Sequence, residues 1–319
     1  MIDVVIKNRV VEAEAVVRLV LGRAGGGALP PFEAGAHIDV HLPSGLRRQY
    51  SLCRLQVDPN YYEIAVLKDP QSRGGSEELH QLQIGDSLRI SAPRNRFPLA
   101  GKEGKSLFIV GGIGVTPLLP MAQTLQCTGT EFEFHYCAKA PETAAFSGAL
   151  AKCSFADKVH FHYSRQPQSS GRMDVAKVLE PHVADAELYV CGPADFISSI
   201  LEQARTLGWP WERLHREYFS APLTDGGHAD NAPFRIKIAS SGEVFEVEAD
   251  QSITDVLEKN GFYLPVSCCE GVCGTCLTRL VEGEADHRDV FLYMQEREEG
   301  ELILPCCSRA KSEMLVLDL

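Results

Sequence analysis

The sequence predicts a multidomain chain in which an antiparallel β-barrel, an α/β domain with a parallel sheet and a smaller α+β domain follow one another. Three observations predict this order. Short segments of alternating apolar and polar residues fill the first hundred positions, strands separated by helix-length stretches fill the next hundred, and a hairpin and a capped helix open the last part. A length of 319 residues fits two or three domains of about 100–200 residues each.

The barrel is expected over residues 1–101. Segments 36–42 and 62–66 alternate apolar and polar side chains, and Pro43-Ser44-Gly45 is a turn signal between strands. This part of the sequence has little helical periodicity. Short strands joined by turns favour a small antiparallel barrel.

The parallel-sheet domain is expected over residues 102–221. Buried strands are predicted over 106–110, 132–137, 159–163 and 188–191. Thr116 and Pro117 predict the N-cap and first turn of a helix that runs to about Leu125, and a later helix over 194–207 ends before Gly208. Strands that alternate with helices imply a parallel sheet with crossover helices.

Residues 222–233 predict a linker because they are polar, contain Gly and Pro and lack periodicity. The remaining residues, 234–319, have the size of a small domain. A hairpin is expected around Ser241-Gly242, and a helix follows with Ser252 and Asp255 as its capping box and Gly261 beyond its end.

Composition and charge exclude several classes of protein. A hydrophobic content of 45% with 23% charged residues is that of a globular chain, and no segment approaches the ~18 apolar residues of a membrane span. The net charge of −12 disfavours nucleic acids and anionic membranes as partners. Residues 1–5 carry an acid where a secretory signal has basic residues, so a cytoplasmic protein is expected.

The 11 cysteines indicate metal or redox chemistry, because their odd total, the lack of a secretion signal and the tight cluster of some of them near one end do not suit a disulfide framework. The spacing C-x4-C-x2-C, with a fourth cysteine 30 positions further on, is typical of a plant-type [2Fe–2S] site and comprises Cys268, Cys273, Cys276 and Cys306. A structural zinc site is the alternative, although zinc modules usually pair two Cys or His knuckles.

Two glycines lie within the four-cysteine pattern. Gly271 and Gly274 allow the loop to curl around a cluster, so that backbone amides point at the sulfurs and stabilise added negative charge. Cys269 and Cys307 each follow one of the four cysteines, and we expect them to be non-coordinating thiols that face away, with ligand exchange as the alternative.

Two loops indicate a nucleotide crevice. The segment Gly111–Pro117 follows a strand and opens a helix, where backbone amides can meet a pyrophosphate. It is not the G-x-G-x-x-G fingerprint, and Cys137-Ala138-Lys139 stands where that motif's acid is expected. Cys191-Gly192-Pro193 ends a later strand, at the edge where open α/β sheets bind ligands. The alternatives are a tight turn and a small core cysteine.

Two further segments suit an anionic, aromatic ligand. Alternation places Arg48 and Tyr50 on one face of a strand, where they offer a cation and a stacking ring. Ser72–Ser76 contains two glycines ahead of Glu77 and resembles an anion nest at a helix start. A surface ion pair and an ordinary capped turn are the structural alternatives.

In this order, Arg48–Ser51, Arg73–Ser76, Gly111–Pro117, Cys191–Pro193 and the four-cysteine pattern resemble the phthalate dioxygenase reductase and vanillate demethylase reductase family over essentially the whole chain. Related reductases carry the ferredoxin domain first, so the order is diagnostic. The resemblance implies an FMN-binding, ferredoxin-reductase-like barrel over 1–101, an NAD-binding domain over 102–221 and a β-grasp [2Fe–2S] ferredoxin domain over 234–319.

The resemblance also implies roles for single residues. Arg48, Tyr50 and Ser51 would hold the flavin, with Ser51 at its reactive edge, and Cys191 would lie near the nicotinamide ring. Phe219, in a segment that closes over the flavin, would be a ring neighbour. The FMN phosphate would be held by Arg73, Gly74, Gly75 and Ser76, and the nicotinamide nucleotide by Gly112, Gly114, Thr116 and Pro117.

NADH supplies two electrons as a hydride whereas the cluster takes one at a time, so a carrier that is stable in both one- and two-electron states must stand between them, and flavin has that property. The resulting hypothesis is a monomeric reductase that passes electrons from NADH through FMN and [2Fe–2S] to an oxygenase component. This partner is expected to belong to a Rieske-type non-heme iron system that hydroxylates or O-demethylates an aromatic or other small organic compound. NADH over NADPH rests on the resemblance, and Lys139 or Arg165 is able to meet a 2′-phosphate.

Acidic residues of the last domain are candidates for the face that docks on the oxygenase, with a solvated loop as the alternative; they are Glu282, Glu284, Asp286 and Asp289. Two other functions stay open. One is an NADH-dependent flavin reductase that acts on a quinone or another small acceptor, and the other is a redox-sensing binding protein.

Overall fold

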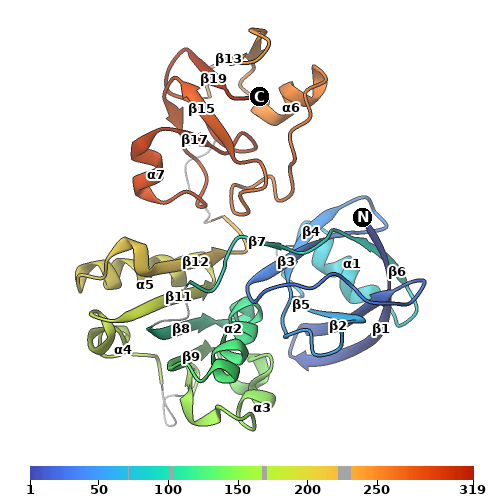
Figure 1. Ribbon diagram of the computed structural model, residues 1–319, viewed down its shortest axis with the longest axis vertical. Coiled ribbons are helices and arrows are strands. Elements are labelled where there is room, and N and C mark those ends of the chain that lie inside the picture. The colour runs from blue at the N-terminus through green and yellow to red at the C-terminus, as the bar shows by residue number, and fades with distance from the viewer. Residues whose placement is uncertain (71, 101–103, 167–170, 222–230) are drawn as a thin grey trace. The chain divides into compact units, whose positions relative to one another are not determined.

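The computed structural model describes residues 1–319 except 71, 101–103, 167–170 and 222–230 (Figure 1). The chain forms two compact units, Met1–Glu217 and Tyr218–Leu319. The first unit contains both the barrel and the parallel sheet. The predicted boundary at 101/102 and most of the predicted linker lie outside the described residues. Within the described part of the chain, no helix has the length and apolar character needed to cross a membrane.

The N-terminal half of the first unit is an antiparallel sheet of seven strands in the order β4-β3-β6-β1-β2-β5, with β7 beside β3. Its two ends meet because Leu52, just after β4, forms an antiparallel bridge with Ile64 in β5. Helix α1 spans Gly75–Gln81. The strands are β1 (Ile2–Ala13), β2 (Val16–Arg23), β3 (Ala36–His41), β4 (Arg47–Ser51), β5 (Tyr61–Leu67), β6 (Ser87–Ile90) and β7 (Arg94–Asn95). The predicted barrel is confirmed.

The second sheet of this unit has the order β10-β9-β8-β11-β12, and its first four strands are parallel. The strands are β8 (Lys105–Gly111), β9 (Phe132–Ala138), β10 (Val159–Tyr163), β11 (Ala186–Gly192) and β12 (Leu214–Tyr218). Helices α2 (Val115–Thr128), α3 (Ser147–Leu150), α4 (Val175–Leu179) and α5 (Ala194–Thr206) connect them, with short 3-10 turns η1 (Gly112–Gly114) and η4 (Glu180–His182). The predicted parallel-sheet domain is confirmed.

The start of α2 differs from the prediction. The turn η1 leads directly into the helix, so Gly114 is the N-cap and Thr116 already lies inside the first turn. The Thr116 hydroxyl donates to the Ile113 carbonyl at 3.1 Å instead of capping the helix. The prediction of Thr116 as N-cap is therefore wrong.

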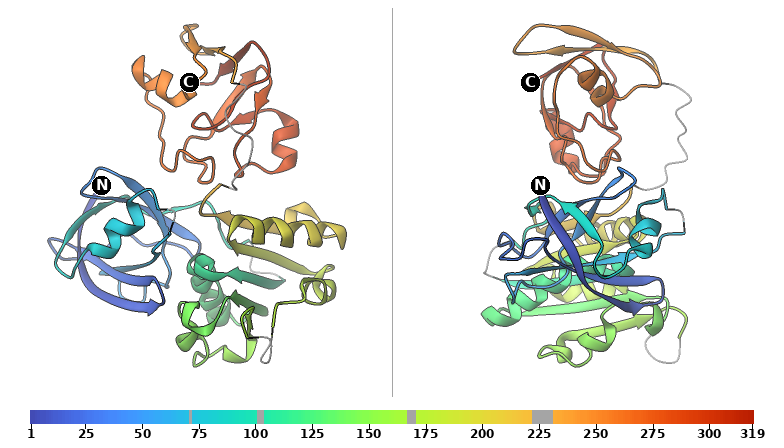
Figure 2. Two further views of the ribbon diagram at one scale, coloured as in Figure 1. Left: turned by 180° about the vertical axis from the view of Figure 1, so that it is seen from behind. Right: turned by 90° about the vertical axis from the view of Figure 1, so that its right-hand side faces the viewer.

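The barrel and the parallel sheet share packed residues (Figure 2, left view, blue beside green and yellow). The Phe97 and Tyr189 rings meet edge to face with 5.9 Å between centroids. The Ala100 amide donates to the Tyr189 hydroxyl at 2.6 Å, and the Leu55 amide donates to the Gln123 side chain at 3.3 Å. These contacts fix the carboxyl ends of the parallel strands relative to the barrel.

The second unit has a mixed sheet in the order β14-β13-β19-β15-β17, in which β13 is antiparallel to β14 and parallel to β19. Its elements are β13 (Phe234–Ile238), β14 (Val244–Val247), α6 (Ile253–Lys259), β15 (Thr278–Glu282), β16 (Ala285–Asp286), α7 (Met294–Glu299), β17 (Leu302–Ile303), β18 (Arg309–Ala310) and β19 (Met314–Leu317). Ser252 and Asp255 form the predicted capping box of α6. The hairpin, the helix and the β-grasp arrangement agree with the sequence prediction.

Candidate functional site

The four cysteines of the predicted cluster converge in the second unit. Hydrogen bonds join the Cys268 thiol to those of Cys273 and Cys306, and the Cys276 thiol to that of Cys306. Three of the four side chains are buried and Cys268 is partly exposed. Hydrogen bonds from the neighbouring thiols lower the pKa of Cys268 and Cys276, and the same contacts raise the pKa of Cys273 and Cys306, so the four thiols share their protons as one coupled group.

The loop around these sulfurs curls as its glycines predict. Gly271 has a φ of 71° and Gly274 a φ of 64°, and a Cβ on Gly274 would lie 2.3 Å from the Phe291 ring. No residue other than glycine fits this position without displacing an aromatic side chain.

Backbone amides face the sulfurs. The Glu270 amide donates to the Cys268 Sγ at 3.4 Å and the Thr275 amide to the Cys273 Sγ at 3.5 Å. Such bonds stabilise the negative charge of an iron–sulfur centre. Four converging sulfurs with amide donors around them fit a [2Fe–2S] cluster.

The two neighbouring cysteines differ. Cys269 is exposed, as expected of a non-coordinating thiol. The expectation that Cys307 faces away is wrong, because its thiol hydrogen-bonds to Cys306 and its Sγ would lie 2.6 Å from a Cβ on Gly271. Cys307 therefore packs beside the sulfur cluster.

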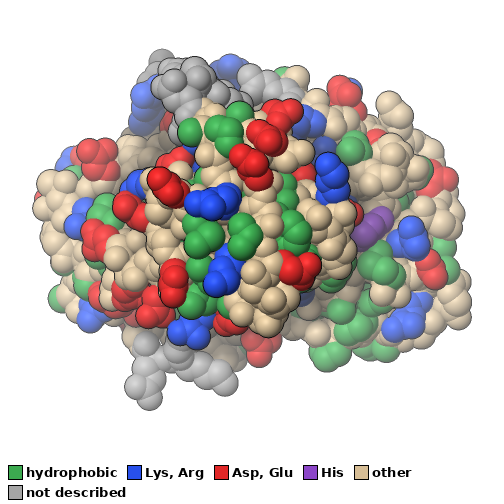
Figure 3. All heavy atoms as spheres, turned by 90° about the horizontal axis from the view of Figure 1, so that it is seen from above, with side chains coloured by type: hydrophobic (Ala, Val, Ile, Leu, Met, Phe, Trp, Pro, Cys, Tyr) green, Lys and Arg blue, Asp and Glu red, His purple; other side chains and the backbone are tan. Residues whose placement is uncertain are grey.

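The acidic residues predicted to form a docking face do not share one environment. Asp289 is buried, accepts from the Leu292 amide at 2.8 Å and faces Arg297, so it supports the loop and cannot dock a partner. Asp286 pairs with Arg288 at 2.7 Å and Glu284 with Lys311 at 3.0 Å. Acidic, basic and apolar side chains are interspersed on the face drawn in Figure 3. The prediction of Asp289 as a docking residue is wrong.

In the first unit, Arg48 on β4 lies against the start of α1. Its Nη2 donates to the Arg73 carbonyl at 3.1 Å, and a Cβ on Gly75 would lie 2.7 Å from its Cγ. Gly74 caps α1 with a φ of 89°, and the Ser76 hydroxyl accepts from the Asp69 amide at 3.2 Å. The structure thus places a guanidinium beside a glycine-capped helix start, a combination that fits a phosphate group.

Next on β4, Tyr50 is half-buried, and burial raises the pKa of its hydroxyl. Its ring stays neutral at all physiological pH values, which suits a stacking surface. Ser51 ends the strand and is buried.

The Ser51 hydroxyl donates to the Glu217 Oε2 at 3.3 Å, which joins the end of β4 to β12. Glu217 keeps some exposed surface, but its carboxyl group lies inside, and this burial raises its pKa to about 8 against the opposing effect of the Ser51 hydrogen bond. Burial and the Glu217 charge raise the pKa of the buried Cys191 thiol. Glu217 therefore interacts with both Ser51 and Cys191, by a hydrogen bond to the first and electrostatically with the second.

The segment predicted to close over the flavin is Glu217–Phe219, in which Phe219 was predicted to be the ring neighbour and Glu217 was given no role of its own. Phe219 is 40% exposed and follows β12 by one residue, in the second unit. The sequence offered one signal for Glu217, an acidic residue close to a segment that was predicted to bind a ligand. The local pattern does not indicate which side chains of β12 turn inward.

The structure brings together the two predicted nucleotide loops. A Cβ on Gly114 would lie 2.2 Å from the Cys191 carbonyl oxygen, and one on Gly192 would lie 2.9 Å from the Gly111 Cα. Gly112 has a φ of 54° and no atom within 4 Å of the position of a Cβ, so a ligand can approach the backbone there. Thr116 and Pro117 are buried in the first turn of α2.

A barrel joined to a parallel nucleotide sheet, followed by a cysteine centre in a β-grasp unit, defines an iron–sulfur oxidoreductase. Residues 236–311 match the protein-family profile of the 2Fe-2S iron-sulfur cluster binding domain. The vanillate O-demethylase oxidoreductase of Pseudomonas sp. (strain HR199 / DSM 7063) is 48% identical over 320 residues, which cover 100% of both chains.

Two solved structures are also similar. Phthalate dioxygenase reductase, described as a modular structure for electron transfer from pyridine nucleotides to [2Fe–2S], matches 99% of this chain and 97% of its own with a TM-score of 0.72 and 37% identity. An intact type IV self-sufficient cytochrome P450 monooxygenase matches with a TM-score of 0.87 and 33% identity; all of this chain is covered, but it spans only 41% of that protein. The chain belongs to the family of oxygenase reductases that includes vanillate O-demethylase oxidoreductase and phthalate dioxygenase reductase.

Proposed function

We propose that this chain passes electrons from NADH through FMN and a [2Fe–2S] cluster, one at a time, to the oxygenase component of a Rieske-type non-heme iron hydroxylase or O-demethylase. The observation that carries the proposal is the convergence of four cysteine sulfurs in a unit that follows a barrel and a nucleotide sheet. The proposal assigns FMN to residues 1–101, NADH to 102–221, a linker to 222–233 and the cluster to 234–319.

FMN, when bound, supplies the conversion of a hydride pair into single electrons. We assign its phosphate to the Arg48 guanidinium and the backbone at the start of α1, and its ring to Tyr50 and Ser51. The contact of Arg48 with Arg73 and Gly75 supports this assignment, because it gathers a fixed cation and the helix start in one place. Phosphate contacts are assigned to Arg73, Gly74, Gly75 and Ser76, and Phe219 is proposed as a further ring neighbour.

We assign the nicotinamide to the end of the crevice at Cys191, with the nucleotide along Gly112, Gly114, Thr116 and Pro117. Since the pKa of Glu217 is about 8, its carboxyl group holds a proton at neutral pH, and this end of the crevice carries no negative charge there. Ser51 orients that carboxyl group through the 3.3 Å hydrogen bond.

The partner is proposed from the relatives. Vanillate O-demethylase oxidoreductase is 48% identical over the whole chain, which favours an oxygenase component that O-demethylates an aromatic compound. A heme monooxygenase is a second candidate acceptor, because the chain also matches part of a self-sufficient cytochrome P450 monooxygenase with a TM-score of 0.87.

The deciding experiment is an anaerobic NADH titration of protein reconstituted with flavin, iron and sulfide, followed by visible absorption and low-temperature EPR. Flavin bleaching together with the rhombic signal of a reduced [2Fe–2S] centre is the expected result. Bleaching without that signal would overturn the cluster step and favour a simple flavin reductase. Slow NADH oxidation with every acceptor would favour a redox-sensing binding protein.

A second measurement separates the two acceptors. Purified Rieske oxygenase and purified cytochrome P450 are each supplied at equal concentration, and their reduction is followed under limiting reductase. We expect at least tenfold faster reduction of the Rieske component, and an equal or higher rate for the heme protein would overturn that choice of partner.

A further inference from the structure

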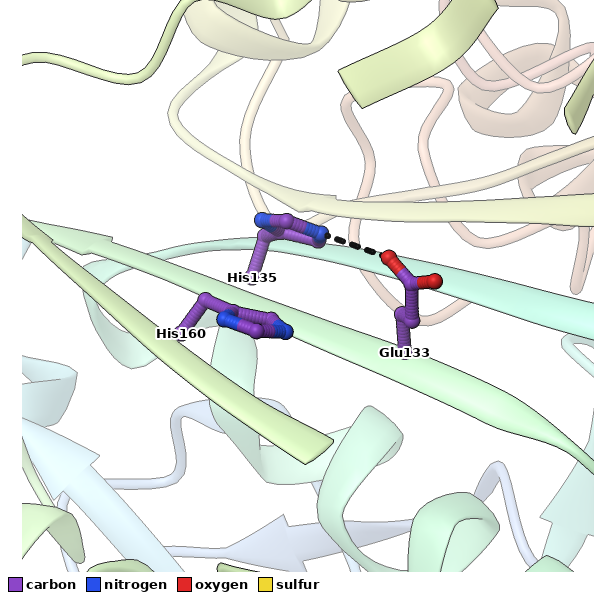
Figure 4. Close-up of side chains that lie close together, drawn as sticks. All are labelled: Glu133, His135 and His160. Carbon is purple, nitrogen blue, oxygen red and sulfur yellow. Dashed lines mark hydrogen bonds and ion pairs between the residues drawn. The ribbon is translucent and has the colours of Figure 1, made fainter. Parts of the chain in front are cut away.

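A group of histidines on the parallel sheet has no part in the proposed electron path. Glu133 and His135 lie two residues apart on β9 and so point to the same face, and the parallel register places His160 of β10 beside His135. The carboxyl ends of these strands carry the predicted nucleotide loops, and the three side chains lie earlier along the strands. Figure 4 shows the three side chains gathered over the two strands.

The donor atoms of the three residues lie close enough to share one ion. One ligand atom of each lies within 4.8 Å of the others. The His135 Nε2 is 3.4 Å from the Glu133 Oε2, and the His135 and His160 rings stack with 4.8 Å between centroids and 25° between planes. Because the rings are nearly parallel, both turn a nitrogen toward the carboxylate, as Figure 4 shows. Donors around a tetrahedral Zn²⁺, at about 2.0–2.1 Å from the ion, stand roughly 3.3 Å apart, so small side-chain rotations close the site.

Surrounding groups orient these donors. The His135 Nδ1 is 3.1 Å from the His162 Nε2, which leaves Nε2 of His135 to face Glu133. Lys105 binds the other carboxylate oxygen, Oε1, at 2.7 Å. A second hydrogen bond that fixes the imidazole and a neutralised, oriented carboxylate are the usual outer partners of a metal ligand.

We propose that Glu133, His135 and His160 bind a divalent transition-metal ion of the Zn²⁺ type. Two imidazoles and one carboxylate are a donor set that such ions accept, and the fourth position is open to water or to His182, whose Nε2 is 3.5 Å from the Glu133 Oε2. His160 is exposed and gives the ion a route of entry. The bound ion fastens β10, the edge strand of the sheet, to β9.

A stacked and hydrogen-bonded imidazole cluster without an ion is the competing explanation, and it predicts no metal affinity.

The test uses the untagged full-length holoprotein, in which the iron–sulfur cluster occupies the cysteines. Zn²⁺ is titrated in competition with a chromophoric chelator, and the zinc-loaded protein is measured by X-ray absorption at the zinc edge. We expect one tight Zn²⁺ per chain, nitrogen and oxygen neighbours at about 2.0–2.1 Å, and no sulfur neighbour at about 2.3 Å. His160→Ala, at an exposed position, is expected to weaken binding at least tenfold.

Two variants complete the test. His135→Gln removes the central ligand and is expected to weaken Zn²⁺ binding at least as much as His160→Ala. His41→Gln, a half-buried histidine on β3 of the same unit, is the matched control and is expected to bind Zn²⁺ as the unmodified protein does. Sulfur neighbours at the zinc edge, equal affinity in His160→Ala and the unmodified chain, or no binding at micromolar Zn²⁺ would each overturn the proposal.

Discussion

The cysteine centre and the proposed flavin–nucleotide site are built in opposite ways. Three of the four cysteines lie within residues 268–276 of one loop, and the glycines that shape the loop stand among them. The proposed site draws Ser51, Cys191 and Glu217 from three strands of two sheets, and the Ser51–Glu217 hydrogen bond spans 166 positions. A site within one loop leaves its pattern in the sequence, whereas a site assembled from distant strands depends on packing that no local pattern records.

The largest effect is expected when one cysteine ligand is removed from the cysteine centre. Cys306→Ser removes one of four sulfurs, so the cluster should not assemble, and reduction of a protein acceptor should fall at least 100-fold. NADH oxidation with ferricyanide should stay within twofold, because that acceptor can draw on the flavin directly. EPR and stopped-flow absorption measure both steps.

Cys269→Ser is the matched control, because Cys269 is an exposed neighbour of a ligand. It should leave the EPR signal and both rates unchanged. Loss of the cluster in this variant would show that ligands exchange between adjacent cysteines.

Substitutions in the proposed flavin site are expected to weaken cofactor binding by smaller factors. Arg48→Ala removes the cation that lies against Arg73 and Gly75, and a charged hydrogen bond to phosphate contributes about 1.5–3 kcal/mol. The dissociation constant of FMN should rise about 10- to 100-fold, as measured by flavin fluorescence during titration of the apoprotein. Arg47→Ala, on the opposite face of the same strand, should change it less than threefold. Equal losses in the two variants would contradict the phosphate assignment.

Glu217→Gln should change how stability depends on pH. The folded pKa of about 8 lies above the ordinary value of 4.5, so folding holds the proton more tightly and this contribution is complete below about pH 4.5. It is lost as the pH rises toward 8, at up to about 1.4 kcal/mol per pH unit. The glutamine variant should lack this decline. Both tryptophans, Trp209 and Trp211, lie in the first unit, so urea unfolding followed by their fluorescence measures it at pH 5.5, 6.5 and 7.5.

Glu212→Gln, an exposed acid just before β12, is the control and should keep the decline of the unmodified protein. If Glu217→Gln keeps the same slope as well, the Glu217 carboxyl group is ionised in the folded protein at neutral pH.

The difference between a site within one loop and a site built from distant strands also explains how much the sequence could predict. The strand predicted over 159–163 has those bounds in β10, and the Ser252–Asp255 capping box is present, because alternation and capping depend on neighbouring residues. Thr116 failed as an N-cap because a 3-10 turn precedes the helix. Glu217 was given no role because its contact with Ser51 joins strands far apart in the sequence. Asp289 was misjudged because the polarity of a loop acid does not indicate whether its own loop folds over it. Sites formed by neighbouring residues could therefore be predicted from the sequence, whereas the orientation of an individual side chain on a strand could not.

The smallest effect is expected at the loops that follow β9 and β10. The Arg165 amide donates to the Lys139 carbonyl at 2.9 Å, so the backbones of the two loops pair there, and both residues are exposed. If they meet a 2′-phosphate, Lys139→Ala should lower kcat/KM for NADPH about two- to fivefold and leave that for NADH unchanged, because an exposed ion pair contributes about 1 kcal/mol or less. Lys152→Ala, at another exposed lysine of the same unit, should alter neither value. An equal fall for both nucleotides would place Lys139 against a part of the nucleotide that NADH and NADPH share.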